Sequence, residues 1–355
     1  MIRTASMAHA SALALAAAAL AVNVPAAGGA LPYIVAHRLV LAGSSPVGSL
    51  AFAPDGKLAY AAAGDALRSF EVATGALADV VKLPGQVVGV AASSAEGGTV
   101  YVAVRAPSQL MFLSMHPLRV RASVAIRGGA PTALLYEPSE HSLYVESRSD
   151  HSVTRLDSGD GRTIAVGHLQ GDLEQMAGDG RGTVYVANSS SDAIDVLATG
   201  KMTSLGGIPT PDCHAPTGLD LDPVGRRLFV ACSNGRALVI DTDMGFAFEQ
   251  LPIQNGKELR TVFAFHPSGP GGWKGGAFIA GDGPELDAIR MNAFISYTGA
   301  GAIRLPGRAT ALAVSPAAGQ IWIALAPPVG ATAANDARQS TGVEIRALVV
   351  GGGSQ

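Results

Sequence analysis

Cysteine and clusters of basic residues are scarce in this chain, and each shortage excludes a class of protein. Two cysteines among 355 residues are too few for a disulfide-dense scaffold or a four-cysteine zinc site. Only five of the 25 basic residues are lysines. No run of basic residues occurs along the chain, so we expect no nucleic-acid partner. Charged residues make up 15% and hydrophobic residues 48%, which excludes a disordered chain and indicates a sizeable core.

Long hydrophobic runs are also missing beyond the N-terminus. The first ten residues contain one arginine and no acid, and SALALAAAALAV (11–22) follows as an apolar run of twelve. Residues 1–26 are therefore predicted to be a secretory signal peptide, cleaved after Ala26 or as late as Ala30. No later run approaches ~18 apolar residues, so no transmembrane segment is predicted. We expect a soluble periplasmic or secreted protein in which residues 31–355 form a single domain.

The rest of the chain repeats one pattern of short apolar strands separated by turns rich in Asp, Pro and Gly. The repeat units begin at Val47, Val87, Pro131, Leu173, Pro216, Leu259 and Ala309. Their spacing of roughly 40 to 45 residues is the period of four-stranded propeller blades. No convincing helical pattern of about ten residues separates the strands, which argues against a doubly wound α/β fold. The sequence thus predicts an all-β fold, a seven-bladed β-propeller.

The last unit is short of one strand. An insertion at 327–340 precedes GVEIRALVV (342–350), which supplies only a third strand. We predict that YIVAHRLVL (33–41) is the fourth, so that the N-terminal strand completes the last blade and closes the ring. Such closure leaves no exposed sheet edge and needs no partner subunit, so we expect a monomer.

Several strands resemble those of a known repeat family. VYVAV, LYVES, VYVAN and LFVAC stand where YVTN-repeat propellers carry their YVTN-like strand, and IDTDMG (240–245) and FEVATG (70–75) match that family's strand ends. The whole mature chain is similar to YncE-like, YVTN-repeat exported bacterial propellers. The resemblance implies a propeller and export, but no defined activity. A glycine-rich insertion (267–276) in the sixth unit and a short fourth unit depart from the pattern.

The two cysteines bracket the first two strands of the fifth unit, CHAPTGLDLDPVGRRLFVAC. If DPVG closes this hairpin, Cys232 faces Pro216 and Cys213 lies three residues further out. An even cysteine count in an oxidising compartment predicts a disulfide between Cys213 and Cys232. Free thiols, a redox pair or Cys–His–Cys metal ligation with His214 are the alternatives. A structural metal site usually has four protein ligands, and this segment offers only the two cysteines and His214, so no metal site is predicted.

One face of the predicted ring gathers polar residues. In a propeller the loop entering each first strand and the loop between the second and third strands share that face, where ligands commonly bind. The candidate ligand-binding residues at this channel mouth are Gln86, Arg105, Arg148, Glu174, Asn188, His214, Asn234, Arg260, Asp282 and Arg308. Such a mixture would suit an anionic or polyhydroxylated small molecule. The alternative is that they are solvated loop residues.

Catalytic motifs are missing from the chain. No H-x-x-x-H, G-x-S-x-G or C-x-x-C occurs, so we predict no catalytic residue and no cofactor. The sequence favours an exported binding module for a small ligand or a periplasmic protein. Two alternatives stay open: a lactonase-type propeller hydrolase using His214, Arg260, Glu174 and Arg148, and an accessory protein of a periplasmic quinoprotein pathway.

Overall fold

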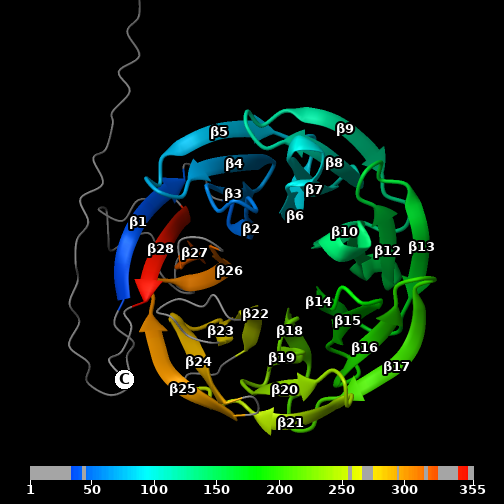
Figure 1. Ribbon diagram of the computed structural model, residues 1–355, viewed down its shortest axis with the longest axis vertical. Coiled ribbons are helices and arrows are strands. Elements are labelled where there is room, and N and C mark those ends of the chain that lie inside the picture. Colours follow the sequence, from blue (N-terminus) through cyan, green and yellow to red (C-terminus); the bar gives the residue numbers. More distant parts are fainter. Residues whose placement is uncertain are drawn as a thin grey trace, which may run out of the picture.

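The strands of this protein are arranged in a ring (Figure 1). A computed structural model describes residues 33–41, 45–254, 258–265, 275–293, 296–315, 319–326 and 343–350. Within these ranges 28 strands form seven four-stranded antiparallel sheets, which confirms the seven-bladed β-propeller. The helices of the described residues are the short 3-10 turns η1 (Ala95–Gly97), η2 (Pro138–Glu140) and η3 (Arg148–Asp150). No helix in this part of the chain is long and apolar enough to cross a membrane.

Each blade runs from the centre of the ring to its rim in four strands. The innermost strands of blades 1 to 7 are β2 (Val47–Phe52), β6 (Gln86–Ser93), β10 (Pro131–Glu137), β14 (Leu173–Gly178), β18 (Pro216–Asp222), β22 (Leu259–Phe265) and β26 (Arg308–Val314). The second strands are β3 (Leu58–Ala63), β7 (Thr99–Arg105), β11 (Ser142–Ser147), β15 (Thr183–Asn188), β19 (Arg227–Cys232), β23 (Gly276–Gly281) and β27 (Gln320–Ala326).

The two outer positions complete the blades. The third strands are β4 (Ala66–Glu71), β8 (Gln109–Ser114), β12 (Ser152–Asp157), β16 (Ala193–Ala198), β20 (Ala237–Asp241), β24 (Glu285–Ala293) and β28 (Val343–Val350). The rim strands are β5 (Leu77–Lys82), β9 (Val120–Ala125), β13 (Thr163–His168), β17 (Thr203–Pro209), β21 (Phe246–Gln250), β25 (Ser296–Arg304) and β1 (Tyr33–Leu41).

The N-terminal strand closes the last blade, as the sequence predicted. β1 pairs antiparallel with β28, from Tyr33 opposite Val350 to Leu41 opposite Val343, and Figure 1 shows the two strands side by side at the rim. Arg38 of β1 and Glu344 of β28 form an ion pair of 3.0 Å between Nη2 and Oε2. The insertion at 327–340 and most of the one at 267–276 lie outside the described residues.

The core consists of the surfaces where neighbouring blades meet. Each second strand contributes one large aromatic side chain that is at most 3% exposed; these are Tyr60, Tyr101, Tyr144, Tyr185, Phe229, Phe278 and Trp322. Because a blade is covered on both faces, its inner strands are apolar on both sides and show little alternation. Trp322 of blade 7 packs against Phe52 and Phe70 of blade 1, with ring centroids 5.7 and 6.3 Å apart, and so joins the last blade to the first.

The hairpin turns use the predicted Asp, Pro and Gly residues. In the DPVG turn of blade 5, Oδ1 of Asp222 accepts hydrogen bonds of 3.0 Å from the backbone N–H groups of Val224 and Gly225. Arg226 then adopts φ of 54°, in the left-handed region. These turns lie at the face opposite the disulfide, so they do not contribute to the central site described next.

Candidate functional site

A β-bulge interrupts the innermost strand of every blade near its first residues. At each bulge the pairing with the second strand skips one residue, or two in blade 4. The skipped residues of blades 1 to 7 are Gly48, Val88, Thr132, Glu174 with Gln175, Thr217, Arg260 and Thr310. A bulge frees a residue from the ladder and redirects its side chain, often next to a functional site. The seven bulges thus form a ring of redirected residues around the central axis.

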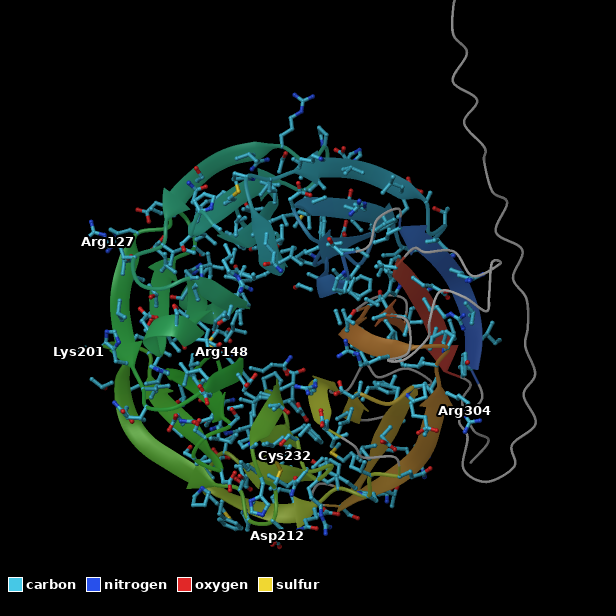
Figure 2. All side chains as sticks on the ribbon, turned by 180° about the vertical axis from the view of Figure 1, so that it is seen from behind. Arg127, Arg148, Lys201, Asp212, Cys232 and Arg304 are labelled. Atoms are coloured by element: carbon cyan, nitrogen blue, oxygen red, sulfur yellow. A yellow bond between two sulfur atoms is a disulfide. The ribbon has the colours of Figure 1, made fainter. Side chains whose placement is uncertain are left out.

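This bulge ring surrounds a cavity of about 430 Å³. The bulge residues of blades 1 to 6 all line it, and the charged residues that line it are Glu146, Arg148, Glu174, Asp220 and Arg260. Figure 2 shows Arg148 at the inner edge of the ring, whereas Arg127, Lys201 and Arg304 lie at the rim. The volume is within the usual range of small-molecule pockets, roughly 300 to 1,000 Å³.

Arg148 and Glu174 join blades 3 and 4 at this cavity. Nη2 of Arg148 donates to Oε2 of Glu174 at 2.7 Å, and its Nε donates to the carbonyl of Leu173 at 2.8 Å. Ser189 adds a hydrogen bond of 3.4 Å to the other carboxylate oxygen of Glu174. Burial raises the pKa of Glu174, although Arg148 and Ser189 oppose that rise. The pair therefore places one cation and one anion side by side on the cavity wall.

Arg260 belongs to a second charged group that joins blades 6 and 7. Its Nε donates to Oδ1 of Asp282 at 3.0 Å, and its Nη2 donates to Oε2 of Glu258 at 2.8 Å. Arg308 donates to Oδ1 of Asp282 at 3.1 Å. The hydrogen bond that Arg260 donates to Asp282 raises the pKa of Arg260 above its ordinary value. The structure thus brings Arg148, Glu174 and Arg260 to one cavity and holds Arg260 through Asp282.

Other residues of the candidate set do not line the cavity. Gln86 and Arg105 face each other across the β6–β7 ladder at the start of blade 2. Asn188 is 2% exposed, and its Nδ2 donates to Oδ2 of Asp195 at 2.8 Å, which gives it a structural partner. Asn234 donates to the carbonyl of Asp212 at 3.0 Å, and Asp212 lies toward the rim in Figure 2.

The two cysteines form the predicted disulfide. Their Cα atoms are 5.4 Å apart, and the bond ties the loop before β18 to the end of β19. Both residues are buried in the core between blades 4 and 5, together with Ile194 and Ile208. The bond uses both thiols and leaves no thiolate for the alternative Cys–His–Cys metal site.

His214 is bonded to a residue of the neighbouring blade 4 and is not among the residues that line the cavity. Its Nδ1 lies 2.8 Å from Oδ2 of Asp192, and Oδ1 of Asp192 accepts the backbone N–H of Ala215 at 2.7 Å. These two hydrogen bonds lower the pKa of Asp192. The structure therefore separates His214 from Arg148, Glu174 and Arg260, the other residues of the lactonase alternative.

Glu146 is a cavity residue that the sequence interpretation missed. It lies on β11, is fully buried, and its Oε1 accepts a hydrogen bond of 2.7 Å from Oγ1 of the bulge residue Thr132. Burial raises its pKa to about 7, against the opposing effects of Thr132 and Arg148. A signal was present, because LYVES has glutamate where VYVAV, VYVAN and LFVAC have alanine.

Comparison with known proteins adds no family to this description. No model of a known protein family matches the chain, and no curated protein matches it. The YVTN-repeat resemblance accordingly rests on the strand and turn motifs of the repeat.

Proposed function

We propose that this protein is an exported, YncE-like β-propeller that binds a small polyhydroxylated molecule in its central cavity. The observation that carries the proposal is the convergence of Arg148, Glu174 and Arg260, from three different blades, on one cavity of about 430 Å³. A specific protein interface needs a much larger area than the wall of one cavity of this size offers.

The pairing of the charges favours a polyhydroxylated ligand over an anionic one. Arg148 is bonded to Glu174, and Arg260 is bonded to Asp282 and Glu258, so neither arginine offers an uncompensated positive charge. What the wall offers instead is hydrogen-bond donors beside acceptors, with the hydroxyl groups of Thr132 and Thr217 between them. A ligand hydroxyl is both donor and acceptor, and so it matches such a wall.

Binding of three matched six-carbon probes tests this proposal. Sorbitol, gluconate and glucamine differ in charge but share a polyol chain, and their binding to the mature protein is measured by titration calorimetry. We expect at least one probe to bind. We also expect Arg148→Ala and Arg260→Ala to weaken that binding by roughly 10- to 100-fold, since each removes hydrogen bonds from a charged group.

The rim residue Lys201 provides the control, because it lies far from the axis in Figure 2. Lys201→Ala is expected to bind the probes as the unaltered protein does. Failure of all three probes to bind, or equal binding by the Arg148 and Arg260 variants, would contradict the proposed function.

Export is the second part of the proposal, and the N-terminal segment and the disulfide support it. Disulfides persist in oxidising compartments such as the periplasm. Because β1 begins at Tyr33, cleavage after Ala26 or Ala30 would leave every described strand intact. The intact mass of the exported protein is expected to equal that of residues 27–355, or of residues 31–355 if cleavage follows Ala30, less two hydrogens. A product that retains residues 1–26, or two titratable thiols, would contradict this part.

A further inference from the structure

We propose that Glu146 is a ligand-binding residue of the central cavity and that it selects a polyol carrying a protonated amine. This inference rests on the proposed function and deepens it, because it names the ligand's chemical class. It starts from a break in the repeat and is supported by an unpartnered oxygen atom and by the charges around it.

The repeat shows that Glu146 is an exception. In the second strand of each blade, the residue two positions after the large aromatic side chain lies next to the bulge. In six blades that residue is alanine: Ala62, Ala103, Ala187, Ala231, Ala280 and Ala324. In blade 3 it is Glu146, opposite Ala133. Alanine satisfies the blade packing elsewhere, so the fold itself does not require a carboxyl group here.

One oxygen atom of the Glu146 carboxyl group has no hydrogen-bond partner among the described residues. Thr132 fixes Oε1, whereas Oε2 is buried without a hydrogen-bond partner among the described residues. Glu146 is also among the residues that line the cavity. A buried oxygen without a partner is costly, and natural proteins seldom keep one without a use. The free Oε2 therefore marks a point where a ligand is expected to donate a hydrogen bond.

The surrounding charges decide which donor fits. Two charged groups act on Glu146: Arg148, in η3 directly after its strand, favours the ionised form, and Glu174 of β14, to which Arg148 is already bonded, opposes it. The strand neighbours of Glu146 on β10 and β12 are Ala133 and Val153, both uncharged. The cavity wall as a whole carries three acids and two arginines. An ionised Glu146 thus needs a further cation, and a ligand ammonium group supplies both the charge and the N–H.

Such a ligand would bind in a pH-dependent way. Because burial raises the pKa of Glu146 to about 7, the carboxylate form that attracts an ammonium group is scarce in mildly acidic solution. The apparent affinity for a cationic ligand scales with the fraction of protein in that form. Binding is therefore expected to strengthen as the pH rises to about 8.

Glucamine and sorbitol form the decisive pair of probes, since they differ by one amine. Titration calorimetry on the mature protein is expected to show that glucamine binds more tightly than sorbitol. Its affinity should rise at least tenfold between about pH 5.5 and about pH 8, while that of sorbitol changes little.

Two substitutions at Glu146 test the assignment. Glu146→Ala installs the residue that the other six blades use, and Glu146→Gln keeps the shape without the charge. Both are expected to abolish the preference for glucamine and its pH dependence, so that glucamine and sorbitol bind with similar affinity. Glu174→Gln is the comparison variant: it should weaken all probes, and because the Glu174 charge helps to raise the pKa of Glu146, the pH dependence should persist with a lower midpoint. Thermal unfolding of each variant verifies that it is folded.

The outcomes separate this inference from the proposed function. If glucamine and sorbitol bind equally, and the Glu146 variants change neither, the inference is overturned and the proposed function stands. If sorbitol binds better and more tightly in acid, a protonated Glu146 donates to the ligand, and the amine is ruled out. If no probe binds, both proposals are overturned.

Discussion

At the scale of single residues, Glu146 carries an energetic penalty that its alanine counterparts in the other blades do not. Its carboxyl group is buried on β11, with one oxygen hydrogen-bonded to Thr132 and the other unpartnered among the described residues. Binding sites often retain such costly groups, because a ligand can provide the missing partner. The penalty can be measured without knowing the ligand.

The stability of the protein should therefore depend on pH through Glu146. Burial raises the pKa of its carboxyl group from 4.5 to about 7 in the folded state, so between these values the folded state binds more protons than the unfolded state. Its contribution is thus favourable below about pH 4.5 and is lost as the pH rises to about 7. We expect Glu146→Ala to be more stable than the unaltered protein at about pH 8, by roughly 2–3 kcal/mol.

Urea unfolding at about pH 5 and about pH 8 measures the free energy of unfolding of the unaltered protein and of Glu146→Ala. The difference between these two free energies should shrink at the lower pH. Glu174→Gln serves for comparison, because Glu174 has an ion-pair partner in Arg148. An Ala variant that is less stable than the unaltered protein at about pH 8 would show that Glu146 is paired in the folded state.

At the scale of strands and loops, the sequence predicted the scaffold well and the site in part. Periodic apolar segments and Asp, Pro and Gly turns are local signals, so the seven units and the DPVG turn could be recognised. The bulges could not, because a bulge is set by how two strands pair and not by either strand alone. The bulges nevertheless decide that Glu174 and Arg260 reach the cavity.

The loops explain why other candidates lie elsewhere. The loop that enters a first strand runs from the rim of one blade to the centre of the next. The distance of a residue from the axis therefore depends on its place along that loop. His214 lies two residues before β18 and bonds to Asp192 of the neighbouring blade, whereas Arg260 lies within β22. Glu146 was hidden for another reason: it lies within strand β11, one residue before its end, where loop-based reasoning does not look.

At the scale of the whole molecule, the last blade is completed by a pairing between the first and last described strands of the chain. β1 contributes the rim strand of blade 7, and the ion pair between Arg38 and Glu344 joins residues 306 positions apart. Trp322, on β27 of the same blade, packs against Phe52 and Phe70 of blade 1. The last blade is therefore held both by the first strand of the chain and by the first blade.

Removal of the closing strand should open the ring. A chain that begins at residue 42 lacks β1, and so it exposes the edge of β28 and loses the burial of Leu41. We expect its free energy of unfolding to fall by more than ~3 kcal/mol, since several apolar side chains lose their cover. A chain that begins at Ala30 keeps β1 and should unfold like the mature protein in thermal denaturation.

A synthetic peptide of residues 33–41, added to the shortened chain, is expected to restore part of the lost stability by pairing with β28. If the shortened chain unfolds at the same temperature as the mature protein, β1 is dispensable and the closure does not stabilise the ring.

The pairing of β1 with β28 also affects the order in which the parts of the ring can form. β1 is synthesised before the other described strands and its partner β28 after them, so β1 stays unpaired while the strands between them are produced. Contacts between residues this distant in sequence form late in folding. A long loop has to be closed first, and its entropy cost is met before the contact contributes any stability. A chain that stops before β28 has nothing for β1 to pair with, and hydrogen exchange should find its remaining blades less protected. The ring can therefore close only after all the strands from β2 to β28 have been produced.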